Sequence, residues 1–218
     1  MHLPRKHTNA DFAKPETILA KAKSTAATAP TRPSSRHVTF PLNFPIHSPS
    51  NLPNPLQRAY SSGHQIASHT WSHQDLMTLD ATHYYEQIYY NEMALRNILG
   101  FIPTYFRPPY VDCDDACHAT LGELGYHSIY YDIDTFDYEN DAADLIQTSK
   151  NNFAAYIDPK PTNALSLEHD THYQTVYNLT AFLLQTIAAN GYGTSVTVGE
   201  CLGDPPANWY RAASGTTG

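Results

Sequence analysis

From Leu56 onward, short apolar segments alternate with longer segments that have a helical period, and this alternation limits the possible folds most strongly. Short strands separated by helices are typical of a sheet with crossover helices. We therefore predict an α/β fold. The predicted strands are residues 65–68, 104–107, 127–132, 164–168 and 194–198, and the predicted helices are residues 54–61, 80–99, 114–124, 142–153 and 173–190.

The predicted helix at 80–99 has the clearest limits. Asp80 is a helix-capping residue type, and Gly100 is the residue type that most often ends a helix. The side chains expected to recur at a helical period between them are Tyr85, Ile88, Tyr89, Leu95 and Ile98.

The charge is divided unevenly along the 218 residues. Residues 1–58 hold eight Lys and Arg against two acids, whereas residues 59–218 hold five against 19. Nine of the 16 prolines also precede residue 58, so we expect residues 1–55 to be a poorly structured arm. We predict a folded domain at 56–205 and a C-terminal tail at 206–218, with no nucleic-acid partner because the folded part is acidic.

The sequence has no apolar run long enough to span a membrane, and its N-terminus has no apolar stretch typical of a secretory signal. Three cysteines are too few for a disulfide-built protein. A local bridge between Cys113 and Cys117 is possible but not implied by their spacing, and Cys201 would then be unpaired.

Several polar residues follow predicted strands, where α/β barrels place their chemistry. His69 and His73 are four residues apart, so on a helical turn both could bind one metal ion, although two surface histidines would show the same spacing. Arg107 is followed by two prolines and could orient a carboxylate, or could belong to a plain rigid loop. His169 could be a general acid if the Asp132–Asp137 segment supplied a carboxylate, or it could be structural.

Three aromatic residues lie within these same segments. Trp71, Tyr110 and Tyr138 could form an aromatic wall for a ligand. The alternative is ordinary core packing, where most aromatic surface is buried.

Four segments, in this order, carry a resemblance to a known family. They are GHQIASHTWSHQDL, FRPPY, YDIDTFDY and LSLEHD. Together they resemble the second to fifth motifs of the NodB-type polysaccharide deacetylases, carbohydrate esterase family 4. The wording of the first segment is most similar to fungal chitin deacetylases, and the resemblance covers about residues 56–203.

The resemblance implies a distorted (β/α) barrel that removes N-acetyl groups from a polymeric amino sugar and binds a metal, usually zinc. By motif position, His69 and His73 would be metal ligands and Arg107 would orient a catalytic aspartate. The backbone at Tyr110 would hold the oxyanion, and His169 would protonate the leaving amine.

Further roles follow from the same resemblance. Asp134 would tune His169, Leu167 would line the acetyl pocket, and Trp71 and Tyr138 would face the substrate, with Tyr138 standing where the family often has Trp. Family members are secreted or associated with the cell wall, and we expect a monomer whose partner is chitin or a related polysaccharide. The motifs do not discriminate chitin from acetylxylan or peptidoglycan.

The family's first motif, a Thr-Phe-Asp-Asp-like tetrapeptide, has no match before Gly63. This motif supplies the catalytic base and the third metal ligand, so we expect an incomplete zinc site, a barrel incomplete at its first strand, and reduced or absent activity. A catalytically silent carbohydrate-binding protein is the alternative. A third alternative is that another residue completes the site, for example His37, His47 or a carboxylate from elsewhere in the chain. One hypothesis for the loss is that residues 1–55 replace the family's own N-terminus.

Overall fold

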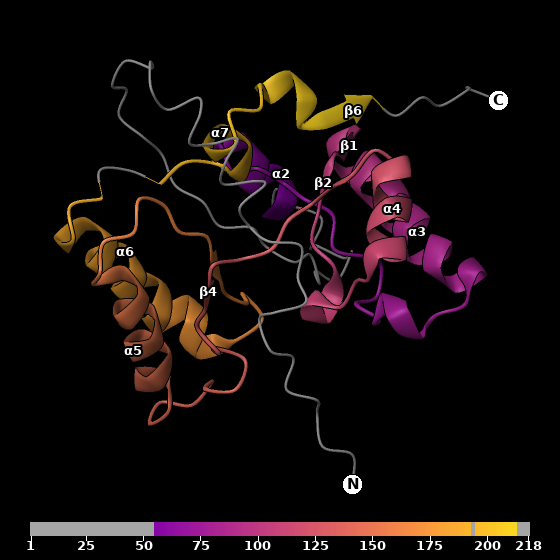
Figure 1. The fold of residues 1–218 in the computed structure, drawn as a ribbon. Helices are drawn as coiled ribbons and strands as arrows, with labels where there is room; N and C mark the ends of the chain where they lie inside the picture. Colours follow the sequence, from indigo (N-terminus) through magenta and orange to yellow (C-terminus); the bar gives the residue numbers. More distant parts are fainter. Residues whose placement is uncertain (1–54, 193–194, 213–218) are drawn as a thin grey trace, which may run out of the picture.

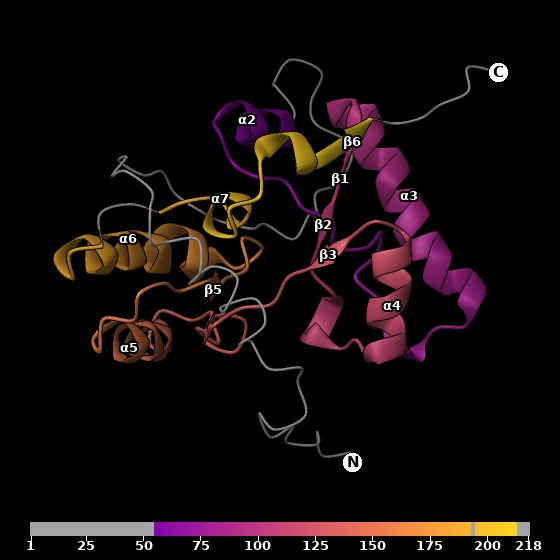
Figure 2. The same cartoon turned by 45° about the horizontal axis from the view of Figure 1, so that its top comes forward.

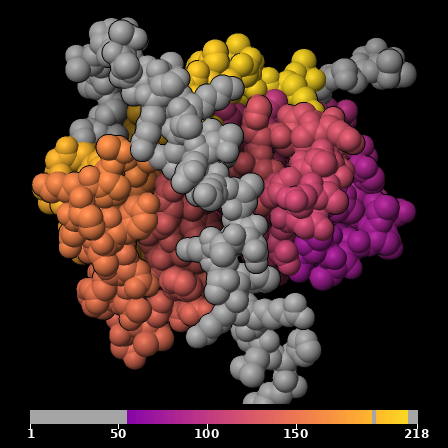
Figure 3. All heavy atoms as spheres, viewed as in Figure 1, coloured from indigo at the N-terminus to yellow at the C-terminus, as the bar shows by residue number. Residues whose placement is uncertain are grey.

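Helices at two ends of the molecule enclose a set of short strands (Figures 1 and 2). The computed structural model describes residues 55–192 and 195–212. Figure 3 shows the same division on the surface, with the residues of α3 and α4 on one side and those of α5 and its neighbours on the other. The helices are α2 (Pro55–Ser61), α3 (Ala81–Leu99), α4 (Asp115–Glu123), α5 (Ile146–Ile157), α6 (Thr180–Ala189) and α7 (Val198–Cys201).

Short helical turns connect these elements. In the part of the chain that the structure describes, three are 3-10 turns, η2 (Leu76–Thr78), η3 (Pro109–Val111) and η5 (Pro206–Asn208), and one, η4 (Thr175–Leu179), is a π-helical turn that leads into α6. No helix in the described ranges is long and apolar enough to cross a membrane.

The strands form three two-stranded sheets. They are β1 (Phe101–Pro103) antiparallel to β6 (Tyr210–Ala212), β2 (Tyr105–Phe106) parallel to β3 (His127–Ser128), and β4 (Ile133–Asp134) parallel to β5 (Ser166–Leu167). Ser68 makes a parallel bridge to Phe106. The predicted strands at 104–107, 127–132 and 164–168 are thus present but shorter, and 65–68 contributes one bridge. Within the described residues, these pairs stay separate and do not join into one continuous barrel sheet, whereas the resemblance implied a distorted barrel incomplete at its first strand.

Helix α3 has the predicted limits. The Asp80 carboxylate accepts a 3.0 Å hydrogen bond from the His83 backbone N–H, and Gly100 ends the helix with a φ of 85°. Ile88 and Leu95 are buried, as their period predicts, but Tyr85 and Tyr89 are exposed. The tyrosines therefore lie on the solvent side of the apolar stripe rather than within it.

Two predictions near the C-terminus need correction. Residues 195–197 form no strand, and α7 begins at Val198 because Thr197 and Glu200 form a capping box; residue 194 lies outside the described residues. The predicted tail from residue 206 is structured as far as Ala212, because β6 pairs with β1. Trp209, which precedes β6, is buried against this part of the core.

Among the described residues the core consists of four apolar clusters: two lie under the helices at the two ends, one lies around the central strands, and one lies between α2 and α3. One joins α3 and α4 to β2 through Ile88, Leu121 and Phe106. Another joins α5 to η4 and α6 through Phe153, Leu179 and Leu183. The two helical ends are therefore held by separate apolar contacts on either side of the strands.

Cys113 and Cys117 form a disulfide at the start of α4, which resolves the pairing that the sequence left open. Cys201 is free and exposed. The predicted arm at 1–55 lies outside the described residues, apart from Pro55, which begins α2.

Candidate functional site

The loop after Ser68 brings His69 and His73 together. Their ring centroids are 4.8 Å apart in an edge-to-face arrangement. The loop is not the helical turn that the spacing suggested, because Thr70 and His73 have φ values of 69° and 56°. Backbone in this left-handed region is strained for non-glycine residues and is concentrated at functional sites.

His69 is held in one tautomer. Its Nδ1 lies 2.5 Å from the carbonyl oxygen of Arg107, which can only accept, so Nδ1 carries the proton and Nε2 has a free lone pair. Burial, and then the positive charge of Arg107, lower the pKa of His69 to about 3. The ring is therefore neutral at neutral pH, which is the form that binds metal ions.

Two buried polar residues of α3 fix this loop. The Gln87 side chain accepts a 2.9 Å hydrogen bond from the Ser72 N–H and donates one of 2.8 Å to the Ser72 hydroxyl. Asn91 donates a 2.8 Å hydrogen bond to the Ser68 hydroxyl. Because polar groups this deep are costly unless paired, α3 and the His69–His73 loop hold each other in place.

Arg107 follows β2 and is largely buried. Burial lowers the pKa of its guanidinium to about 10, while Glu168, Asp137, Tyr131 and Asp134 act in the opposite direction. In the part of the chain that the structure describes, no carboxylate forms an ion pair with it. Arg107 was expected to orient a catalytic aspartate, and the described residues supply no aspartate that pairs with it.

Tyr110 directly follows the proline pair and is 67% exposed. It has a φ of 57°, and its ring packs edge-to-face on His73 at 4.9 Å between centroids. Val111 also has a positive φ, of 60°. The strained turn thus places Tyr110 beside the histidine pair.

The carboxylate that holds His169 belongs to Asp137. Asp137 Oδ1 lies 2.8 Å from His169 Nδ1, and Oδ2 accepts hydrogen bonds from the backbone N–H of His169 (2.6 Å) and the hydroxyl of Thr175 (2.8 Å). Asp137 is fully buried. Burial alone would raise the pKa of Asp137, but the hydrogen bonds from His169 and Thr175 outweigh it and hold that pKa below its usual value.

The resemblance assigned the tuning of His169 to Asp134, whereas the structure pairs His169 with Asp137. Asp134 accepts hydrogen bonds from the hydroxyls of Tyr138 (3.2 Å) and Tyr131 (3.4 Å) and from the Phe136 N–H (2.8 Å). The chain turns at Phe136, whose φ is 55°, so the side chains of Asp134 and Asp137 point to different neighbours.

The remaining predicted residues lie around this centre. Tyr138 packs edge-to-face on His169 at 5.3 Å between centroids. Trp71 is 40% exposed and contacts Tyr90 of α3 at 6.2 Å between centroids. Leu167 is buried in β5, and its carbonyl accepts a 3.0 Å hydrogen bond from the Thr135 hydroxyl.

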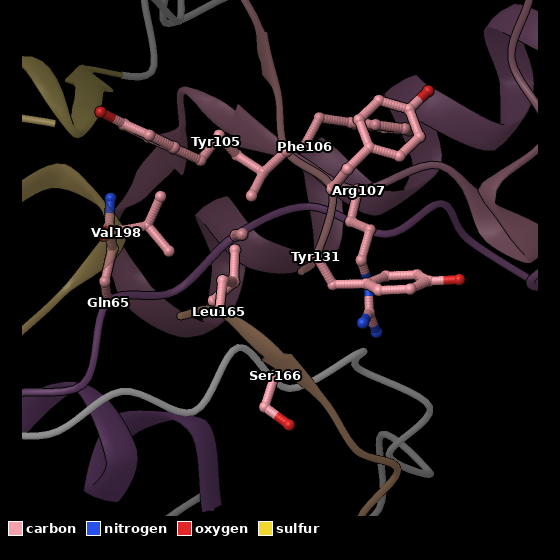
Figure 4. A pocket seen from close by; sticks show the side chains of 11 residues that line it. Gln65, Tyr105, Phe106, Arg107, Tyr131, Leu165, Ser166 and Val198 are labelled. Carbon is pink, nitrogen blue, oxygen red and sulfur yellow. The ribbon is translucent and has the colours of Figure 1, made fainter. Parts of the chain in front are cut away.

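A narrow cavity lies among the residues of the central strands. Figure 4 shows the Arg107 side chain running beside the Tyr131 ring, with Ser166 of β5 below and Tyr105 pointing the opposite way. Its lining includes Arg107 but none of His69, His73 and His169. Arg107 therefore connects the cavity to the site, and the cavity is not itself the reaction site.

The three imidazoles act on one another electrostatically. The charges of Arg107, His73 and His169 all lower the pKa of His69, and the charges of Arg107 and His169 also lower that of His73 after burial. The structure therefore gathers the predicted histidines and Arg107 into one region.

A zinc ion fits this donor set in part. His69 offers Nε2, and the ring of His73 is adjacent. Zinc sites in enzymes ordinarily use three protein ligands. Within residues 55–192 and 195–212, no group of three His, Cys, Asp or Glu residues could hold a metal ion. The third ligand would have to come from outside these ranges.

Sequence reasoning missed Gln87, Asn91 and Thr175 as site residues. A signal existed for the first two: Gln87 and Asn91 are four residues apart and lie on the buried side of α3, beside Ile88 and Leu95. No local sequence signal marks Thr175, because its partner Asp137 is 38 residues away.

Comparison with known proteins shows that the chain is similar to polysaccharide deacetylases. The sequence profile described as polysaccharide deacetylase matches residues 7–129, beginning inside the predicted arm. A chitin deacetylase of Colletotrichum lindemuthianum is 43% identical over 169 residues, which are 77% of this chain and 67% of that protein. A chitin deacetylase of a Pestalotiopsis species is 48% identical over 157 residues, which are 72% of this chain and 51% of that protein. The chain thus spans about half of the Pestalotiopsis protein.

Solved structures agree with the sequences. The Colletotrichum lindemuthianum chitin deacetylase matches with a TM-score of 0.76 at 36% identity and covers 96% of this chain and 90% of that one. A peptidoglycan N-acetylglucosamine deacetylase matches with a TM-score of 0.62 at 25% identity and covers 90% and 85%. The α/β fold is therefore the one seen in these deacetylases.

Proposed function

Because the chain belongs to the polysaccharide deacetylase family, carbohydrate esterase family 4, we propose that it acts on the N-acetyl groups of a chitin-like polymer. The observation that carries this proposal is the pairing of buried Asp137 with His169 beside the His69–His73 pair. An amide hydrolase needs a proton donor for the leaving amine, and an imidazole held by a carboxylate is suited to that role.

His169 would deliver its proton from Nε2, because Nδ1 hydrogen-bonds to Asp137. Asp137 would keep the ring in this tautomer and stabilise its charged form. The backbone N–H at Tyr110, in its strained turn, would donate to the developing oxyanion, and the exposed ring of Tyr110 would contact the substrate. Tyr138 and Trp71 would bound the sugar on two sides, and Leu167 would contact the acetyl methyl group.

His69 and His73 would hold the metal, most suitably zinc. When bound, zinc polarises the amide carbonyl and makes water a better nucleophile. With two neutral imidazoles and no carboxylate among the described residues, we expect weak zinc affinity and low turnover. The proposed activity is thus reduced relative to a site with three ligands and a carboxylate base.

The test is acetate release from N-acetylglucosamine hexamer by the purified chain, with zinc and with a chelator. We expect slow, zinc-dependent release that His169→Gln and His69→Gln abolish. His83→Gln is the matched control, because His83 also contacts a carboxylate, Asp80 at 2.8 Å, but on the exposed surface of α3. Release that is unaffected by His169→Gln would refute the proposed role of this residue.

The absence of a third metal ligand from the described residues also favours a second function, a catalytically silent carbohydrate-binding protein of the same fold. The two functions differ in one measurement, made on the same sample. Oligomer binding without acetate release at any zinc concentration indicates the silent protein, whereas zinc-dependent release indicates the enzyme.

A further inference from the structure

Tyr173 and Tyr177 form an exposed aromatic pair next to the site. They are 66% and 72% exposed, and their ring centroids are 4.6 Å apart at an interplanar angle of 36°. Neighbouring Val176 is exposed as well. Contiguous exposed apolar surface of this kind marks binding sites.

The backbone under this pair is fixed to the site itself. Thr175, between the two tyrosines, donates its hydroxyl proton to Asp137, the residue that holds His169. The Gln174 N–H donates a 2.7 Å hydrogen bond to Asp141, and Leu179 is fully buried. The tyrosines are therefore displayed from a rigid base whose position is set by the same carboxylate as that of His169.

The local backbone is unusual. Thr175–Leu179 is a π-helical turn before α6, and such turns are rare and often occur at functional sites. Its wide turn leaves Tyr173 and Tyr177 on the outside while Thr175 and Leu179 point inward.

A row of ring contacts leads from the site toward the pair. Tyr138 packs on His169, and His169 packs on His172 at 5.9 Å between centroids. His172 is in turn held by Asp141, 3.1 Å from its Nδ1, and the next residue is Tyr173. The pair thus continues the surface on which the substrate is proposed to lie.

The charge around the pair limits what could bind there. Residues 130–180 hold nine Asp and Glu against two Lys. A polyanion such as RNA would be repelled, whereas a neutral or cationic polymer would not. The CH faces of pyranose rings are apolar and stack on aromatic rings, so a chitin-like chain fits both the rings and the charge.

We infer that Tyr173 and Tyr177 form a stacking subsite for sugar units of the polymer that lie beyond the unit reacting at His169. The inference rests on the proposed function for its substrate class. Such a subsite would make affinity depend on chain length, because only longer oligomers reach from His169 to the tyrosine pair.

The experiment is titration calorimetry with N-acetylglucosamine dimer and hexamer, which needs no turnover. For Tyr173→Ala/Tyr177→Ala we expect about 10-fold weaker hexamer binding and dimer binding within about 2-fold of the unmodified chain. Tyr173→Phe/Tyr177→Phe should retain hexamer affinity, since the rings remain. The matched control is Tyr85→Ala/Tyr89→Ala, which removes a second exposed tyrosine pair, stacked on the surface of α3, and should leave both affinities unchanged.

Hexamer affinity that is unchanged in Tyr173→Ala/Tyr177→Ala would overturn the inference alone, with the proposed function intact. Equal losses for dimer and hexamer, or an equal loss in the α3 control, would also overturn it. If the unmodified chain binds neither oligomer and releases no acetate, the proposed function fails and the inference fails with it. Thermal unfolding followed by circular dichroism shows that each variant compared is folded, and the single variant Tyr177→Ala replaces the double variant if that one unfolds.

Discussion

Asp137 holds His169 through two atoms at once, with its carboxylate oxygens 2.8 Å from Nδ1 and 2.6 Å from the backbone nitrogen of His169. The ring and its backbone are therefore fixed together. Thr175 adds a third hydrogen bond to the same carboxylate, so β5, η4 and the loop after β4 meet at this buried group.

Asp137→Asn should destabilise the fold because the amide cannot accept from every donor that the carboxylate satisfies. We expect the free energy of unfolding in urea to fall by about 3 kcal/mol. Asp134→Asn is the control and should cost less than about 1 kcal/mol, because Asp134 is partly exposed. Equal losses for the two variants would contradict the central position given to Asp137.

The residues alone left the carboxylate partner of His169 open within the Asp132–Asp137 segment, the family resemblance assigned Asp134, and the structure shows Asp137 in contact with the ring. Positions along a strand alternate between faces, but β4 ends at Asp134, and the positive φ of Phe136 turns the chain before Asp137. The alternation of strand faces therefore could not show which carboxylate after β4 would face His169. His69 and His73 illustrate the same limit: their spacing predicted proximity, but a strained loop rather than a helix produces it.

The elements with strong local signals were predictable. Asp80 and Gly100 set the limits of α3, and the strands near 105, 127 and 166 fall inside their predicted ranges. Pairing of β1 with β6 was not predictable, because it joins segments more than 100 residues apart and both are only three residues long. The Thr197 and Glu200 residue types also signal a helix start at Val198, although residues 194–198 were predicted to be a strand.

Glu168 should make the folded state less stable as pH rises, the reverse of the effect of most carboxylates in folded proteins. Burial raises the pKa of its carboxyl from 4.5 to about 7, and the Ser166 hydroxyl that contacts it offsets this only in part. The folded state then binds more protons than the unfolded state between these values, so the free energy of unfolding falls as pH rises through this window. The loss attributable to Glu168 should reach about 3 kcal/mol by pH 8.

The difference between the unmodified chain and Glu168→Gln isolates this contribution from the other titrating groups. Urea unfolding at pH 5, 6, 7 and 8 should show that Glu168→Gln loses less stability across the series. Glu123→Gln, at an exposed position of α4, should follow the unmodified chain. Parallel pH profiles for Glu168→Gln and the unmodified chain would contradict the raised pKa of the Glu168 carboxyl.

Gln87→Ala and Asn91→Ala test whether α3 positions the His69–His73 loop. Asn91→Ala leaves the buried Ser68 hydroxyl without its partner, and Gln87→Ala removes two hydrogen bonds between α3 and Ser72, so each should lower the free energy of unfolding by about 1–3 kcal/mol. Zinc affinity, measured by competition with a chromogenic chelator, should also fall by about 10-fold or more, because residues that orient metal ligands affect binding.

The control for these two variants is Gln147→Ala. Gln147 donates to Asn151 on the exposed side of α5, so its loss should change neither stability nor zinc affinity measurably. A stability loss in Gln87→Ala and Asn91→Ala with unchanged zinc affinity would make the α3 contacts structural only.

Gly199 lies so close to Trp209 that no side chain can be added without moving the indole. A Cβ at Gly199 would be 2.2 Å from Trp209 Nε1, and that nitrogen donates a 2.9 Å hydrogen bond to the Asp204 carbonyl. Gly199→Ala should therefore displace Trp209, loosen the adjoining β6 from β1, and lower the free energy of unfolding by about 1–3 kcal/mol. Tryptophan fluorescence during urea unfolding measures both the displaced indole and the lost stability. Gly122→Ala in α4 meets open space and should raise stability by about 0.5–1 kcal/mol, so a Gly199→Ala variant as stable as the unmodified chain would contradict the close packing.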